Sequence, residues 1–236
     1  MKALILAAGL GSRLGLDIPK PMYTILGKPI LEHNILLLKK HNIENIYINL
    51  HHMPDVIKNY FGDGSKWNVN ITYSFEENLL GTAGTVKNLT SFWDETPFFV
   101  LYGDNYTNIN LTEMLELHKT TKPLATVALF DPKVSLNSGI AGGIITMDED
   151  NNIHSFIEGK ENGGKWYVNA GVYILESKIL DLLPNGFPSD FGKDIFPKLL
   201  KDGILLKGYL TTGFVFAIDT KDALKTSEEV LNKERN

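Results

Sequence analysis

The stretch that most restricts how this chain can fold lies at its start, between Lys2 and Ile30. An apolar run from Ala3 to Ala8 predicts a buried β-strand, and a glycine-rich turn follows it without a break. Glycines let a backbone approach an anion closely, so that N–H groups converge on phosphate oxygens while nearby cations neutralise the charge. The stretch therefore predicts a phosphate site. Its candidate residues are Gly9, Gly11, Ser12, Arg13 and Lys20.

Two better-known phosphate loops do not fit this turn. A dinucleotide-binding loop needs a third glycine three residues after Gly11, but Leu14 stands there and Gly15 comes one place late. A Walker A loop needs a glycine where Met22 stands and a Ser or Thr where Pro29 stands. The first mismatch disfavours a dinucleotide-dependent oxidoreductase.

The composition bounds the class of protein. With 236 residues, 43% of them hydrophobic, the chain is long enough for one domain with a substantial core. The formal net charge of -5 argues against nucleic acid as a partner, and the absence of cysteine excludes disulfides and thiolate chemistry. No apolar stretch approaches the roughly 20 residues of a membrane span. Charges follow the first apolar run too soon for a signal peptide, so we predict a cytoplasmic protein with no membrane partner.

Strand and helix signals alternate along the first half of the chain. They predict strands at 3–8, 45–50, 69–73 and 98–102, and helices at 30–41, 54–61, 82–89 and 111–118. This alternation predicts an α/β fold, a Rossmann-like three-layer sandwich with a mostly parallel sheet, whose ligands bind at the carboxyl ends of the strands.

After Pro123 the signals change to consecutive strands, which predict a small antiparallel edge or flap over one end of the sheet. The expected strands lie at 125–130, 139–147, 153–157 and 168–175. Then come helices at 179–183 and 194–200, strands at 205–210 and 214–218, and a closing helix at 221–232.

Two aspartates each follow an apolar strand signal. Asp104 comes after the run 98–102 and a glycine, and Asp219 comes directly after the run 214–218. Carboxylates at strand ends lie where an open α/β sheet binds its ligand, and their hard oxygens suit Mg²⁺ that already carries phosphates. Each aspartate also has a structural alternative, because Asp is common in turns and as the N-cap of a following helix.

Gly81 and Thr82 open a predicted helix within the string L-G-T-A-G-T. Small residues permit the close approach of a flat base, and a helix N-terminus offers free N–H groups. A plain capped helix start is the alternative.

A later group of polar residues suits a phosphorylated sugar, because it combines a carboxylate, a cation and an amide. A surface hairpin with a charged tip is the alternative. The three polar residues are Glu158, Lys160 and Asn169, and Gly171 follows them on the same predicted strand as Asn169.

Taken in order, these motifs resemble those of the sugar-1-phosphate nucleotidyltransferases, the nucleotide-sugar pyrophosphorylases. The resemblance rests on G-x-G-S-R with P-K-P six residues later, the G-D and I-D strand ends, L-G-T-A-G and an N-x-G strand. It implies transfer of a nucleotidyl group from a nucleoside triphosphate to a sugar 1-phosphate, in nucleotide-sugar and polysaccharide biosynthesis. It also implies a single domain over 1–236, with a nucleotide-binding half at 1–122 and a sugar-binding half at 123–236.

The resemblance implies a role for each matched residue. Arg13, Lys20 and Asp104 are expected to be catalytic, and Asp104 and Asp219 to hold the cofactor Mg²⁺. The expected nucleotide-binding residues are Leu6, Ala8, Gly9, Gly11, Ser12, Arg13, Gly81 and Thr82. The expected sugar-phosphate-binding residues are Glu158, Lys160, Asn169 and Gly171. This chain has Glu-Gly-Lys where the family usually has Glu-Lys-Pro, so Lys160 is shifted by one residue.

Two features point to different bases. L-G-T-A-G is similar to the base-binding segment of mannose-1-phosphate and heptose-1-phosphate guanylyltransferases. The short spacing from Arg13 to Lys20 is similar to uridylyltransferases acting on amino sugars and to some cytidylyltransferases. We expect GTP with a mannose- or heptose-type 1-phosphate; the alternative is uridylyl, cytidylyl or thymidylyl transfer to another phosphorylated acceptor. A non-catalytic nucleotide-sensing subunit is the alternative from another class, and formation of a homo-oligomer stays open.

Overall fold

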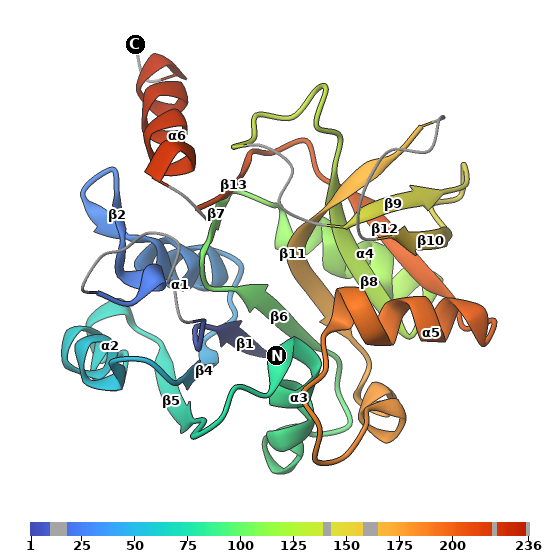
Figure 1. Ribbon diagram of the computed structural model, residues 1–236, viewed down its shortest axis with the longest axis horizontal. Helices are drawn as coiled ribbons and strands as arrows, with labels where there is room; N and C mark the ends of the chain where they lie inside the picture. The colour runs from blue at the N-terminus through green and yellow to red at the C-terminus, as the bar shows by residue number, and fades with distance from the viewer. Residues whose placement is uncertain (10–17, 139–142, 158–164, 219–220, 235–236) are drawn as a thin grey trace.

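One large mixed sheet organises the molecule (Figure 1). The computed structural model describes residues 1–9, 18–138, 143–157, 165–218 and 221–234. Within these residues the sheet has nine strands, and β10-β9-β11-β6-β1-β4-β5 is its main order, with β8 paired to β11 and β12 paired to β8. The strands are β1 (Lys2–Leu6), β4 (Asn45–Leu50), β5 (Asn70–Phe75), β6 (Phe98–Tyr102), β8 (Ala125–Phe130), β9 (Ile144–Met147), β10 (Ile153–Ile157), β11 (Tyr167–Leu175) and β12 (Leu206–Leu210).

Strands β5, β4, β1 and β6 form a continuous run of parallel strands in the sheet. β1 lies at its centre, where Ile5 pairs with Ile48 of β4 and with Leu101 of β6. A central parallel strand is covered on both faces, which explains why its sequence is continuously apolar rather than alternating. The carboxyl ends of all four strands therefore meet at one edge of the sheet.

The strands after Pro123 extend this same sheet. β11 runs antiparallel to β6 through Val172–Leu175 and meets β9 at its other end, through Tyr167 and Val168, while β8 lies along its opposite side. The register with β8 shifts between Asn169 and Tyr173, and Gly171 adopts a positive φ of 70° there. A non-glycine residue rarely adopts this conformation. Asn169 and Gly171 thus lie at the fork where β11 passes from β9 to β6.

Helices cover both faces of the sheet, which gives the three layers. Residues of α1 (Ile30–Lys40), α2 (Pro54–Phe61) and α4 (Leu111–Thr121) share one buried apolar cluster, and residues of α3 (Gly81–Asn88) and α5 (Phe196–Lys201) share the other. The remaining helical elements are α6 (Lys221–Glu234), the π-helix η6 (Phe191–Ile195) and the 3-10 turns η2 (Lys20–Met22), η3 (Ser65–Trp67), η4 (Thr90–Phe92) and η5 (Ser177–Leu182). Two small sheets pair β2 (Thr24–Ile25) with β3 (Lys28–Pro29) and β7 (Asn105–Thr107) with β13 (Val215–Ala217).

The predicted fold class is confirmed, and the differences are local. The predicted helix at 179–183 is the 3-10 turn η5, and the one at 194–200 begins earlier, as a π-turn that leads into α5. The strand predicted at 214–218 pairs with β7 outside the main sheet. For the strand predicted at 139–147, residues 139–142 lie outside the described residues. Among the helices described, none is both long and apolar enough to span a bilayer.

Candidate active site

A cavity of about 270 Å³ opens at the carboxyl ends of the parallel strands β1 and β6. The topology predicts a ligand site at this edge, because the turns after parallel strands meet there. Six residues that the sequence singled out line this cavity. They are Leu6, Ala8, Gly9, Gly81, Thr82 and Asp104.

An ion pair joins two of the predicted catalytic residues. Lys20 Nζ lies 2.5 Å from Asp104 Oδ2, and these residues come from segments 84 positions apart. Lys20 is only 8% exposed and lies in the turn η2 between two prolines, where Met22 N donates to Pro19 O. A buried ammonium group is stable only beside an acceptor. Asp104 provides that acceptor, and its own side chain keeps 30% of its surface exposed.

A glycine fixes where Asp104 leaves its strand. Gly103 N donates to Leu6 O at 2.9 Å, and a Cβ on Gly103 would lie 2.7 Å from that same oxygen. Any other residue would push the ends of β1 and β6 apart. On the opposite side Ile218 N donates to Asp104 O, since β13 runs back beside β7. The residue before Asp219 thus contacts the backbone of Asp104, while Asp219 itself lies outside the described residues, so the predicted pairing of the two carboxylates stays a prediction.

A buried polar network that the sequence did not reveal forms the wall of the cavity. Glu76 is 4% exposed, and its Oε1 accepts from Asn49 Nδ2 at 2.9 Å and from Thr85 Oγ1 at 2.6 Å. Its Oε2 accepts from Leu80 N at 3.2 Å, and Asn49 Oδ1 accepts from Ala7 N. Glu76, Asn49 and Thr85 all line the cavity. The available signal was a carboxylate directly after the strand 70–75, just before L-G-T-A-G.

The N-terminus of α3 is capped from a distant part of the chain. Asp190 Oδ1 accepts from Thr82 N, and Ser189 O accepts from Ala83 N at 2.9 Å and from Gly84 N at 3.2 Å. The prediction of free N–H groups here is therefore wrong for these three residues. The groups that cap this helix belong to residues more than 100 positions later in the chain, and the local sequence cannot show such a contact.

Gly81 is required by the same contact. A Cβ on Gly81 would lie 2.5 Å from Ser189 O, and its φ is 71°. The small residue thus permits close approach of the backbone at Ser189. Asp190, which also lines the cavity, was not predicted.

Of the residues predicted to bind the sugar phosphate, the structure describes Asn169 and Gly171. Asn169 Oδ1 accepts from Gly171 N at 2.9 Å, and Asn169 Nδ2 donates to the Tyr173 hydroxyl at 2.7 Å. Asn105 Nδ2 donates to Ala170 O, which ties this fork to the residue after Asp104. The predicted sugar-phosphate residues that can be placed thus lie on the strand next to β6.

A protein-family model described as nucleotidyl transferase matches residues 2–215 of the chain. The chain belongs to this nucleotidyl transferase family. The resemblance that the sequence motifs carried is thereby confirmed.

The names of similar proteins specify different nucleotides. The chain is 37% identical over 221 residues to the UTP--glucose-1-phosphate uridylyltransferase of a Synechocystis strain, covering 86% of this chain and 56% of that protein. It is 30% identical over 216 residues to the mannose-1-phosphate guanylyltransferase of Mycobacterium tuberculosis, covering 90% and 59%. The chain thus spans a little over half the length of these curated relatives. The crystal structure of HddC from Yersinia pseudotuberculosis complexed with GMP-PN is similar along its whole length, with a TM-score of 0.81, 27% identity, and 98% and 99% of the two chains covered.

Several residues with predicted roles in this nucleotidyl transferase lie outside the described residues. They are Gly11, Ser12, Arg13, Glu158, Lys160 and Asp219. Their roles stay predictions.

Of the two carboxylates predicted to hold Mg²⁺, the described residues include Asp104. Within the described ranges no three His, Cys, Asp or Glu side chains form a cluster that could hold a metal ion on its own. Mg²⁺ is nevertheless usually held by one or two carboxylates, with waters and substrate phosphates completing its shell. The partly exposed Asp104 carboxylate at the cavity fits that pattern.

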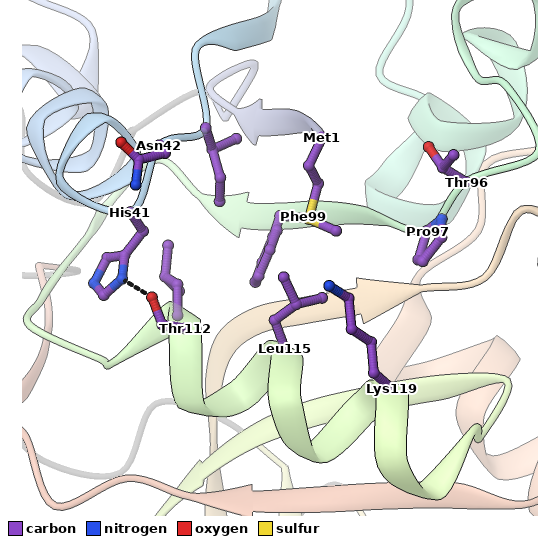
Figure 2. A pocket seen from close by; sticks show the side chains of 11 residues that line it. Met1, His41, Asn42, Thr96, Pro97, Phe99, Thr112, Leu115 and Lys119 are labelled. Carbon is purple, nitrogen blue, oxygen red and sulfur yellow. Dashed lines mark hydrogen bonds between the residues drawn. The ribbon is translucent and has the colours of Figure 1, made fainter.

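A second and larger cavity, of about 420 Å³, lies at the opposite edge of the sheet (Figure 2). Met1 and Phe99, at the amino ends of β1 and β6, face Leu115 of α4 across it. Its lining residues include no carboxylate, and His41 Nδ1 and Thr112 Oγ1 satisfy each other at 2.8 Å. Burial, and then the charge of Lys40, lower the pKa of His41, which keeps this imidazole neutral near pH 7. This cavity was not predicted, and it holds none of the predicted site residues.

Proposed function

We propose that this protein transfers a nucleotidyl group from a nucleoside triphosphate to a sugar 1-phosphate. An oxygen of the sugar phosphate attacks the α-phosphorus, the bond from that phosphorus to the β-phosphate oxygen breaks, and pyrophosphate leaves with the bonding electrons. The Lys20–Asp104 pair carries this proposal, because it places a cation and a carboxylate at the cavity that follows the glycine turn. In such reactions catalysis is mainly positioning and electrostatic stabilisation.

Each charged residue of the site has its own role in this proposal. Lys20 stabilises charge on the α-phosphate, and Arg13 with the N–H groups of the glycine turn stabilises the leaving pyrophosphate. Asp104, together with Asp219, holds Mg²⁺. When bound, that ion neutralises phosphate charge and orients the phosphate oxygens. The half at 1–122 binds the nucleotide and the half at 123–236 the sugar, within one domain that works in the cytoplasm, where nucleoside triphosphates are available.

Glu76 supports GTP as the donor. Guanine presents two adjacent N–H donors on one edge, and an ionised carboxylate only accepts hydrogen bonds. Glu76 Oε2 has one partner among the described residues, the backbone N–H of Leu80, so it keeps capacity for a further donor. Uracil and thymine place a carbonyl oxygen on each side of their single N–H, and a carboxylate repels these oxygens. The guanine complex of HddC and the name of the mycobacterial relative agree with this choice.

Mannose- or heptose-type 1-phosphates are the acceptors we propose. The support is the same similarity to guanylyltransferases, together with an amide at the fork of β11 that can meet sugar hydroxyls. Uridylyl transfer is the second choice, because the Synechocystis relative is more identical to this chain than the mycobacterial one.

Pyrophosphate release tests the proposal. The purified protein is supplied with Mg²⁺, each of GTP, UTP, CTP and dTTP, and a panel of sugar 1-phosphates. We expect release with GTP and a mannose or heptose 1-phosphate. Release with another pair would correct the base or the sugar but keep the reaction. A folded protein that binds a nucleotide and releases no pyrophosphate with any acceptor would indicate a nucleotide-sensing subunit instead.

A further inference from the structure

We propose that Tyr173 is a positioning residue that couples the sugar-phosphate side of the site to the nucleotide cavity. The inference rests on the proposed function, and it assigns a role to a side chain that touches neither substrate. Tyr173 is fully buried in β11, and its hydroxyl joins two residues of different halves. It accepts from Asn169 Nδ2 at 2.7 Å and donates to the Tyr102 hydroxyl at 3.0 Å.

On the sugar side, this contact fixes the orientation of the Asn169 amide. Gly171 N can only donate, so Asn169 Oδ1 must face it, and Nδ2 must then face Tyr173. One N–H and one acceptor position of the amide are left for a ligand. Without the Tyr173 hydroxyl, only the contact to Gly171 would hold the amide. Tyr173 therefore determines how precisely Asn169 can meet a sugar hydroxyl.

On the nucleotide side, the contact holds a wall of the cavity. Tyr102 lines it together with Thr82, Asp104 and Asp190. Burial raises the pKa of Tyr102 to about 12, so its hydroxyl stays protonated at any pH at which the enzyme works. Because this hydroxyl accepts from Tyr173, its own hydrogen is left to donate to a different acceptor.

The Tyr173 ring also reaches the segment that caps α3. It packs edge-on against Tyr102, with centroids 5.7 Å apart, and against Phe191 at 5.6 Å. Phe191 follows Asp190, which binds Thr82 N, and Phe191 N itself donates to Thr82 Oγ1. A shift of Tyr173 would therefore reach Asn169, Tyr102 and the start of α3 together.

Such a shared contact makes binding of the nucleotide and binding of the sugar phosphate cooperative. A nucleotide that orders Tyr102 and Thr82 also orders Tyr173, and with it the Asn169 amide. The sugar phosphate then binds to a site that is already arranged, and the effect must be reciprocal. One neutral hydrogen bond contributes about fivefold to such an equilibrium.

Calorimetry on Tyr173→Phe tests this coupling. The Kd of the sugar 1-phosphate is measured with and without an α,β-methylene analogue of the accepted nucleotide, for the wild type and the variant. In the wild type, we expect the analogue to lower the Kd of the sugar 1-phosphate. In Tyr173→Phe, this enhancement of affinity should be about fivefold smaller. Its KM for the sugar phosphate should rise by a similar factor while kcat changes less. Tyr167→Phe is the control, since Tyr167 is a buried tyrosine of the same strand that makes neither contact.

A double variant separates positioning from general loosening of the fold. If Tyr173 acts through Asn169, Tyr173→Phe combined with Asn169→Ala should raise the KM no further than Asn169→Ala alone. Equal coupling in wild type and Tyr173→Phe, or additive effects in the double variant, would overturn the proposal while wild-type turnover upholds the reaction. Absence of turnover in the wild type with every substrate pair would overturn the proposed function, and the coupling with it.

Discussion

Two cavities among the described residues lie at opposite ends of the same two strands, β1 and β6, and they differ in kind. The smaller one, at the carboxyl ends, is lined by two carboxylates, Asp104, which pairs with Lys20, and the buried Glu76. The larger one, at the amino ends, has mainly apolar walls with the hydrogen-bonded pair His41 and Thr112, and its lining includes one cation, Lys119, but no carboxylate (Figure 2). Cavity volume therefore does not identify the site here. The arrangement of charged groups does.

The difference follows from the direction of the strands. At the carboxyl edge each parallel strand leads outward into a turn, so polar residues from several turns meet in one place. Gly103 shows how close this approach is, since its N–H binds Leu6 O directly. At the amino edge α4 packs against the sheet through apolar side chains such as Leu111 and Met114. The comparison predicts that substitutions at the first edge change catalysis, whereas those at the second change stability.

Asp104→Asn should have the largest effect. The variant keeps the size of the side chain but removes the charge that pairs with Lys20 and that we propose to hold Mg²⁺, so we expect kcat to fall on the order of 1000-fold. Circular dichroism and the midpoint of thermal unfolding should show a folded protein. Asp181→Asn, an exposed aspartate of η5, is the matched control. Near-normal turnover by Asp104→Asn would remove this residue from the mechanism.

Lys20→Met should lower kcat on the order of 100-fold, because in the proposed mechanism this cation stabilises charge on the transferred phosphate mainly in the transition state. The measurement is steady-state kinetics with both substrates varied. The exposed Lys198 of α5, changed to Met, should behave as the wild type. An increase in KM alone, with kcat intact, would mean that Lys20 only helps to bind the ground state.

Glu76→Gln should change the choice of base more than the rate. An amide replaces an acceptor-only carboxylate, so the ratio of kcat/KM for GTP to that for UTP should fall about 10-fold or more. The variant retains a group that can bond to Asn49 and Thr85, which preserves the fold. The neighbouring exposed Glu77, changed to Gln, is the control. If the ratio does not change, Glu76 is a structural residue and does not read the base.

Leu115→Ala probes the second cavity. Leu115 is half-buried, so its truncation should lower the free energy of unfolding by about 1 kcal/mol. Both kcat and KM should stay within about twofold of wild type, since no charged group of the site is touched. Chemical denaturation and steady-state assays measure the two effects. A larger change in kcat than in stability would show that the second cavity communicates with the site.

The smallest effect concerns pH, through His118 on the sheet side of α4. Burial lowers its pKa, and Glu176 only partly opposes this, so the native state binds fewer protons than the unfolded state near pH 6. Stability must then decrease as the pH falls below the unfolded value of about 6.5. His118→Gln should show a smaller drop in unfolding midpoint between pH 8 and pH 5.5 than wild type, whereas exposed His52→Gln should not. Identical pH profiles for His118→Gln and wild type would contradict this origin.

Sequence reasoning succeeded where local pattern decides structure. The continuous apolar run 98–102 predicted β6, and the glycine and aspartate after it predicted a residue at the ligand edge. It failed where distant residues decide. No local signal shows that Ser189 and Asp190 cap α3, or that Glu76 binds Asn49. Such contacts depend on how the whole chain packs, and the polar groups of this site are held mainly by contacts of that kind.

The fate of the phosphates of GTP tests the central claim most directly. GTP labelled at the α- or the γ-phosphate is incubated with Mg²⁺ and the accepted sugar 1-phosphate. The α-label should appear in the nucleotide sugar and the γ-label in pyrophosphate, with wild type and Leu115→Ala alike and with Asp104→Asn at background. Release of the γ-label as orthophosphate, or undiminished transfer by Asp104→Asn, would contradict nucleotidyl transfer at the Lys20–Asp104 cavity.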